Sequence, residues 1–326
     1  MRRLVLMLAM VVMAGPAEAQ RRDDQTYLPG AFNWSFLRRF PEAARLFNAF
    51  DYGHAVLYER LWTAPSAAGP LLERDLEFLT QDLLRRPPRF SIAEEAVMPS
   101  YAGLAPRARQ MFDWAHLLHR QIYDVYADDR IPPTDKQALV ERLTDYYLSN
   151  HALAFASTPK AMALMDDASY SQVFRRENPR FNGLIWAYHW LQVGLYEPLI
   201  GADSPAGRRA GIGQTLARFW AMLDGPRGGF PELMPMTAAV APRFTARHPR
   251  AAAIFDNLHM MHDIISDILS SERVPRALKG KTIEAALAEF RDGSKNVMSV
   301  EEWKGMAEMM GGVARMGGVA WPPPTR

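Results

Sequence analysis

The chain contains no cysteine among its 326 residues. This absence excludes disulfide bonds, thiolate metal sites, covalently attached c-type haem and a cysteine nucleophile. Any metal ligands must therefore come from histidine, carboxylates or methionine. For an exported protein, the lack of disulfides also favours a bacterial periplasm over a eukaryotic secretory route.

The chain also lacks an excess of either charge, with 38 Lys and Arg against 36 Asp and Glu. A balanced charge gives no reason to expect binding to nucleic acid or to an anionic membrane surface. Beyond the N-terminus, no apolar run approaches the roughly 20 residues that a membrane-spanning helix needs. We therefore expect no transmembrane segment in the mature protein.

The N-terminus has the parts of a secretory signal peptide. A basic start at residues 1–3 is followed by an apolar run over 4–14 and an Ala-x-Ala cleavage site at 17–19. We predict that residues 1–19 are removed and that the mature protein is periplasmic or secreted. Retention of this segment as a membrane anchor is the alternative.

One thirteen-residue pattern occurs twice in the chain. F-D-x-x-H-x-x-H-x-x-I-x-D spans residues 112–124 and again 255–267, so the copies are 143 positions apart. A shorter echo, F-D-x-x-H, spans residues 50–54, and together these segments hold five of the eight histidines. The pattern predicts an internally duplicated helix that carries histidines.

Helical spacing places the polar members of each copy on one side of the helix. Each residue advances by about 100°, so Asp, His and His three apart span about 120°. Two such helices could present nitrogen and oxygen ligands to one site, a mixture that suits iron or zinc. The predicted metal ligands are Asp113, His116, His119, Asp256, His259 and His262, with His54 and His189 completing the set.

Other interpretations of these residues remain open. Methionines at 306, 309, 310 and 316 make copper an alternative metal, because thioether sulfur favours Cu(I). Two opposing histidines could hold a haem without a covalent link, which is the weaker alternative. The histidines could also form a structural polar core, or act as acid and base without metal.

Two functions from different classes follow. The first is an exported helical protein with a one- or two-metal centre, oxidative if the metal is iron and hydrolytic if it is zinc, with Tyr123 and Tyr188 as nearby phenols. The second is a non-catalytic periplasmic subunit that docks on a membrane or electron-transfer complex. Its docking elements would be the Gly/Pro-rich segment 224–249 and the C-terminal tail, and its histidines would be structural.

No stretch has a convincing strand pattern, so the predicted fold is an all-α multi-helix bundle. The apolar stretch 181–200 is expected to be its central helix, and capping boxes are expected at Ser91, Thr134 and Ser299. We predict one domain over 20–326, or two packed halves at about 20–200 and 201–304, with a Gly/Met/Pro-rich tail at 305–326. His248, in an arginine-rich context, is expected to be solvated.

The Asp-x-x-His helices resemble those of haemerythrin-like and ferritin-like di-metal bundles in ligand type and helical placement. The resemblance covers only residues 113–119 and 256–262. The His-x-x-x-His and His-x-x-x-Glu helices of the first family are missing, and Asp replaces the Glu of the second. We therefore assign the sequence to no family.

Overall fold

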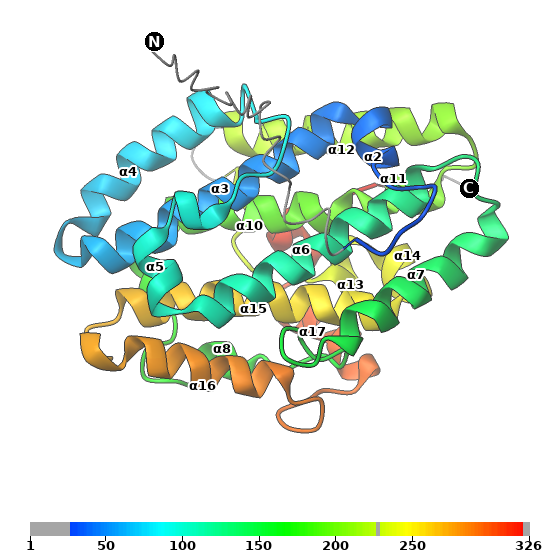
Figure 1. Cartoon of the computed structure of the whole chain (residues 1–326). Helices are drawn as coiled ribbons and strands as arrows, with labels where there is room; N and C mark the ends of the chain where they lie inside the picture. The colour runs from blue at the N-terminus through cyan, green and yellow to red at the C-terminus, as the bar shows by residue number, and fades with distance from the viewer. Residues whose placement is uncertain (1–26, 226–228, 322–326) are drawn as a thin grey trace, which may run out of the picture.

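The chain folds into helices joined by short connections, in a computed structural model that describes residues 27–225 and 229–321 (Figure 1). The predicted signal peptide lies outside these residues. The α-helices, in chain order, are α2 (Ser35–Arg39), α3 (Pro41–Thr63), α4 (Ala68–Phe78), α5 (Pro99–Leu104), α6 (Pro106–Ala127), α7 (Pro133–Ser149), α8 (Ala163–Asp166), α9 (Val173–Glu177), α10 (Pro179–Gly194), α11 (Tyr196–Gly201), α12 (Pro205–Asp224), α13 (Thr237–Val240), α14 (Pro242–Arg247), α15 (Pro249–Ser270), α16 (Lys279–Arg291) and α17 (Val300–Met309).

The described part of the chain also contains short helical turns of other types. These are the 3-10 turns Pro65–Ala67, Glu94–Ala96, Arg276–Leu278 and Val313–Met316, and the π-helical turn Leu79–Leu83. Extended backbone in the described residues pairs only at an isolated bridge between Lys160 and Val297. The predicted all-α class is therefore confirmed.

Four long helices, α3, α6, α10 and α15, gather in the middle of the molecule. Figure 1 shows α4 and α12 along one side of them and α16 along the other. The helix α3 packs against α10 and α15, and α15 packs against α6. Each of the four begins with a proline, whose fixed φ and missing N–H suit the first helical position.

The helix α10 is the buried centre that its composition predicted. Every residue from Phe181 to Gly194 is buried, and apolar side chains on all sides are typical of such a helix. The predicted single helix over 181–200 is nevertheless divided at Leu195 into α10 and α11. Buried apolar side chains from these and the surrounding helices form one contiguous core.

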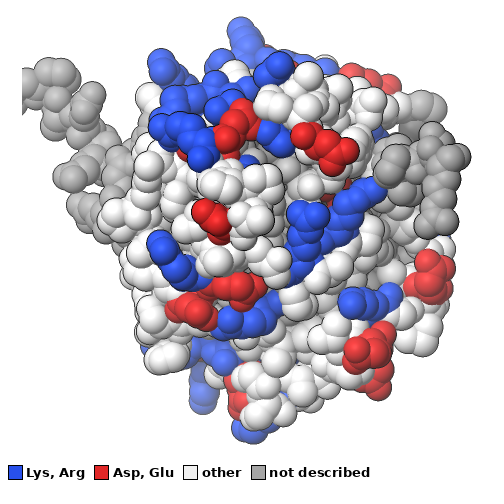
Figure 2. Space-filling model, turned by 90° about the vertical axis from the view of Figure 1, so that its right-hand side faces the viewer, with Lys and Arg blue, Asp and Glu red and all other residues white. Residues whose placement is uncertain are grey.

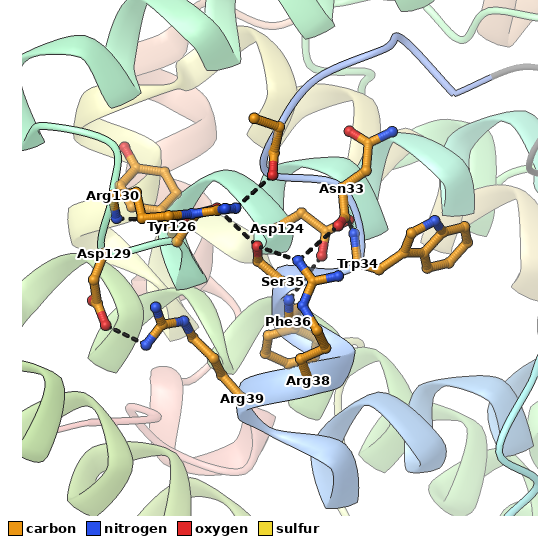
Figure 3. Close-up of polar contacts among 12 residues, drawn as sticks. Asn33, Trp34, Ser35, Phe36, Arg38, Arg39, Asp124, Tyr126, Asp129 and Arg130 are labelled. Atoms are coloured by element: carbon orange, nitrogen blue, oxygen red, sulfur yellow. Dashed lines mark hydrogen bonds and ion pairs between the residues drawn. The ribbon is translucent and has the colours of Figure 1, made fainter.

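A pair of capping contacts fixes the entry to α3. Asp124, at the end of α6, accepts hydrogen bonds from the backbone N–H groups of Trp34 and Phe36, at 2.9 and 2.8 Å (Figure 3). Trp34 has φ 64°, in the left-handed region that side chains other than Gly rarely adopt. The carboxylate therefore holds the start of α2, and with it the approach to α3.

The same arrangement precedes α10. Asp267, at the end of α15, accepts hydrogen bonds from the backbone N–H groups of Gln172 and Phe174, at 2.7 and 2.9 Å. Gln172 has φ 65° and begins the short helix α9. Asp124 and Asp267 are the last residues of the two sequence motifs, so this position has a structural role in both.

Two further contacts recur between α2–α7 and α9–α16, which we call the N-terminal and C-terminal halves. Glu59 accepts hydrogen bonds from backbone N–H groups at the start of α5, and Glu197 does so at the start of α14. Lys136 donates to the carbonyl of Tyr126 at the end of α6, and Lys279 donates to that of Leu269 at the end of α15. Both long motif helices are thus held at their C-terminal ends by lysine.

Three local expectations need correction. Of the predicted capping boxes only that of Ser299 with Glu302 forms. The helix α7 begins at Pro133, two residues earlier than a cap at Thr134 requires, and Ala93 instead of Ser91 is the cap of the turn at Glu94. The segment 224–249 is not irregular throughout, since it contains α13 and α14. His248 is buried, and its Nε2 lies 2.6 Å from the Tyr126 hydroxyl.

The described part of the C-terminal tail packs on the molecule's own core. Met316 is fully buried, and the indole N–H of Trp190 on α10 donates to the Gly318 carbonyl at 2.7 Å. Gly317 has φ 92° and lies so close to Trp190 that a Cβ there would be 2.9 Å from its ring. The tail therefore covers α10, which leaves less of it free for a partner.

The surface carries both charges. Figure 2 shows basic and acidic side chains interspersed over one face of the molecule. Among the described residues, no helix combines the length and the apolar character needed to cross a bilayer.

Candidate metal centre

The four central helices bring six of the predicted histidines into one buried cluster. Each histidine is at most 3% exposed. Their rings are stacked or tilted against one another, with centroid separations from 4.1 to 6.5 Å. The cluster consists of His54 on α3, His116 and His119 on α6, His189 on α10, and His259 and His262 on α15.

Three of these rings converge on one point. The Nε2 atom of His189 lies 3.3 Å from Nε2 of His54 and 3.1 Å from Nδ1 of His262. One nitrogen from each ring can be chosen so that all three lie within 4.8 Å of one another. We call this set the three-histidine group. Three helices contribute to it, so only the tertiary fold assembles it.

The hydrogen bonding of the three-histidine group suits coordination. The Nδ1 atom of His54 lies 3.0 Å from the carbonyl of Phe50, which only an N–H can satisfy. This contact leaves Nε2 of His54 with its lone pair directed at Nε2 of His189. A neutral imidazole has one N–H. The Nε2 atom of His189 therefore cannot donate a hydrogen bond to both His54 Nε2 and His262 Nδ1.

His116 belongs to a neighbouring set that also contains two carboxylates. One donor atom each from Asp51, Glu94 and His116 lie within 4.8 Å of one another. The sequence motifs did not include either carboxylate as a ligand. Asp51 was detectable, because it lies in the echo at residues 50–54, three positions before His54 on the same side of α3. Glu94 had no such signal.

His119 and His259 lie beside these sets. The Nδ1 atom of His119 is 2.8 Å from the Tyr196 hydroxyl, and its ring stacks on Phe255 with centroids 3.4 Å apart. The ring of His259 stacks on that of His189 at 4.1 Å, and neither of its nitrogens has a hydrogen-bond partner. His119 therefore has the Tyr196 phenol as a partner, whereas both nitrogens of the buried His259 ring have no hydrogen bond.

The aspartates at the second position of each motif copy lie outside both sets. Asp256 accepts hydrogen bonds from the backbone and hydroxyl of Thr237 and from the indole N–H of Trp303. Asp113, whose side chain is 36% exposed, pairs with Arg109 one helical turn earlier. Asp256 therefore holds α13 and α17 in place, and Asp113 lies near the surface of α6, so neither belongs to a group of described residues that could hold a metal ion.

Burial sets the protonation of the cluster. It lowers the pKa of His54 to about 3, and it lowers the pKa values of His119, His189, His259 and His262 well below that of free histidine. These rings are neutral at pH 7, which is the state that binds a metal. Burial also raises the pKa of Glu94 well above its usual value, with the negative charge of Asp113 as the next cause.

Two phenols lie in the same region. Tyr188 stacks on Phe50 with centroids 4.2 Å apart, and its ring is 6.1 Å from that of His54. Its buried hydroxyl has no hydrogen-bond partner. The hydroxyl of Tyr123 donates to the Gln192 carbonyl.

No known protein family, no curated protein and no solved structure matches this chain. Its function must therefore be argued from the site. Buried histidine and aspartate side chains are gathered in geometries that could hold a metal ion.

Proposed function

We propose that the protein is an exported metalloprotein whose three-histidine group, His54, His189 and His262, holds a transition-metal ion. The convergence of three buried imidazole nitrogens from three helices carries the proposal. These three nitrogens have only one another as hydrogen-bond partners, and a bound cation would accept the lone pairs of all three at once.

The donor set narrows the metal. Imidazole nitrogen suits zinc, copper, iron and nickel, whereas oxygen ligands would favour magnesium, calcium or manganese. Three protein ligands leave a further coordination position for water or a reactant, as in catalytic zinc sites. Iron, zinc and copper therefore stay the candidates. A non-covalent haem stays the weaker one, and a Soret band in the purified protein would favour it.

The burial of the group favours redox chemistry over hydrolysis of a large substrate. Its three side chains are between 0 and 3% exposed. A polymer or a bulky ester would need the core to open, whereas electrons, dioxygen or peroxide need little space. The nearby phenol of Tyr188 could take part in electron transfer or donate a hydrogen bond to a metal-bound ligand. We therefore favour a small-molecule redox centre with iron or copper.

Elemental analysis of the mature protein, purified without an affinity histidine tag, tests this proposal. About one equivalent of metal assigned to the three-histidine group should disappear in His189→Ala. The matched control is His151→Ala, because His151 is exposed and lies outside the cluster. Wild-type protein that folds and binds no transition metal would overturn the proposal and favour the accessory subunit with structural histidines.

We also propose that the protein is processed by the secretory route. An Ala-x-Ala site at residues 17–19 supports cleavage before Gln20. The intact mass of protein recovered from the periplasm should correspond to residues 20–326. A mass that includes residues 1–19 would instead favour the retained anchor.

We propose, finally, that α2–α7 and α9–α16 descend from one duplicated helical unit. The two sequence motifs support it, as do the paired caps made by Asp124 and Asp267 and the paired contacts of Glu59 and Glu197. Independent origin would not be expected to reproduce both contacts and sequence spacing.

A further inference from the structure

A second group of possible ligands adjoins the three-histidine group. Asp51 comes from α3, His116 from α6, and Glu94 from the 3-10 turn between α4 and α5. The three side chains are 3, 1 and 5% exposed, and they offer two oxygens and one nitrogen within 4.8 Å of one another. The ring of His116 is centred 5.8 Å from that of His262.

Several atoms of this group lack hydrogen-bond partners. Nε2 of His116 has no hydrogen-bond partner, and Nδ1 of His116 and Oδ1 of Asp51 make no hydrogen bond to a third group. Nδ1 of His116 lies 3.2 Å from Oδ1 of Asp51, so the two atoms face the same point. A buried ring with an unpartnered nitrogen is unusual, because most buried polar atoms are satisfied. An ion between these atoms would satisfy them.

The surroundings orient Asp51 as they would a metal ligand. Arg120 binds its Oδ2 atom, which leaves Oδ1 directed at His116. Outer partners of this kind commonly fix ligating carboxylates. The other nearby arginine, Arg109, is paired with Asp113 and Glu95 rather than with this group. Ion pairs of Asp51 with Arg120 and with His116 would explain both carboxylate oxygens and Nδ1 of His116, but not the unpartnered Nε2 atom of His116.

We propose that Asp51, Glu94 and His116 form a second cation site, which takes a harder divalent ion such as Mn²⁺ or Fe²⁺. Two carboxylates and one imidazole supply mainly oxygen, which these ions accept more readily than an all-nitrogen set does. The two adjacent sites would then be unequal, one rich in nitrogen and one rich in oxygen. This second site goes beyond the three-histidine group and does not require it.

Titration of chelator-treated, full mature protein with Mn²⁺ tests the second site. The free ion is followed by its electron paramagnetic resonance signal, and bound metal by elemental analysis. Wild-type protein should bind about one Mn²⁺ at this site. Glu94→Gln should weaken binding by more than the roughly 10–100-fold that outer partners contribute, while His189→Ala should leave it unchanged.

Glu95→Gln is the matched control, because Glu95 is adjacent in sequence and pairs with Arg109 instead. Asp51→Asn is a second variant, and circular dichroism checks that each variant folds. Unchanged Mn²⁺ affinity in folded Glu94→Gln would overturn the second site, as would wild-type protein that binds no Mn²⁺. Loss of Mn²⁺ in both Glu94→Gln and His189→Ala would mean one shared site and would also overturn it. If only the proposal for the three-histidine group is wrong, elemental analysis will find no zinc, copper or native iron bound there, while Mn²⁺ still binds to the second site.

Discussion

The two halves of the molecule use the same scaffold contacts but carry different side chains at the centre. Pro41 begins α3 and Pro179 begins α10, each after a short helix capped by a distant aspartate. Ten residues into each helix, α3 has Asp51 and α10 has His189. The contacts that position the helices are alike, whereas the atoms offered to the centre differ.

The difference continues at neighbouring positions. Thirteen residues into the same helices, α3 has His54 and α10 has Gln192. At the short turns before the two motif helices, each 19 positions before the motif aspartate, the residues are Glu94 and Thr237. At two of these three matched positions the N-terminal half thus has an acidic residue where the C-terminal half has His189 or Thr237. A common scaffold can therefore hold two unlike donor sets side by side.

The largest expected effect is acid sensitivity of the metal-free protein. Five histidines from both halves have pKa values lowered by burial, whereas in the unfolded chain they titrate near 6.5. Below pH 6.5 the unfolded chain takes up protons that the folded chain does not. Their contribution to stability is therefore complete above pH 6.5 and falls by up to about 1.4 kcal/mol per pH unit for each histidine.

Urea unfolding of chelator-treated protein at pH 7.5, 6.5 and 5.5 measures this loss. The variant His54→Gln gives α3 the residue that α10 has at the same position. Its free energy of unfolding should fall less steeply with acid, by up to about 1.4 kcal/mol per pH unit, because one buried histidine is removed. For His54 the loss should continue down to about pH 3, where the folded protein begins to bind the proton. A free energy of unfolding that stays constant between pH 7.5 and 5.5 would contradict the prediction.

The next effect tests whether the aspartate caps are equivalent supports. Asp267→Ala should destabilise the protein by about 3–5 kcal/mol, because it removes a buried partner of Arg175 and leaves two backbone donors unsatisfied. Asp124→Ala should cost less, about 2–4 kcal/mol, through its two backbone donors. Urea unfolding at pH 7.5 gives both values.

Asp166→Ala is the control for these variants, since Asp166 also pairs with Arg175 but is more exposed. It should change stability by less than about 1 kcal/mol. If Asp267→Ala were no more destabilising than this control, the paired caps would not support the two halves in the way proposed.

Local spacing predicted much of the centre. Positions three apart in each motif place both histidines on one helix face, and burial of that face made a cluster foreseeable. The same arithmetic misassigned Asp113, which lies at the edge of the arc and faces Arg109 near the surface. The apolar composition of α10 likewise identified the central helix, with its division at Leu195 left out.

Sequence spacing could not predict the contacts that depend on how the helices pack against one another. Glu94 lies in a single 3-10 turn, and only packing brings it to His116. His248 was misjudged for the same reason, because the junction of α14 and α15 places it against Tyr126 on α6. Sequence neighbours describe one helix face, whereas a site built from three or more elements needs their arrangement.

A smaller effect should follow from exchanging donor atoms between the halves. Asp51→His gives α3 the donor that α10 has at the matching position, so Mn²⁺ affinity should fall at least about tenfold. Metal in the three-histidine group should be retained, because His189 is unchanged. Electron paramagnetic resonance and elemental analysis report the two sites separately. The reciprocal variant His189→Asp should lose the first metal and keep Mn²⁺ binding, and the opposite pattern would refute the proposed division of ligands.

The smallest effect concerns a local cap outside both halves. Ser299→Ala should cost about 1 kcal/mol, because the hydroxyl accepts the Glu302 N–H at 3.1 Å in an exposed capping box. Ser204→Ala, at the similar cap of α12, should cost about the same. Water can replace either hydroxyl, whereas the donors bound by Asp267 are largely shielded from it. Urea unfolding measures the loss of stability in each variant. If Ser299→Ala lost as much free energy of unfolding as Asp267→Ala, burial would not be what makes the distant aspartate caps strong.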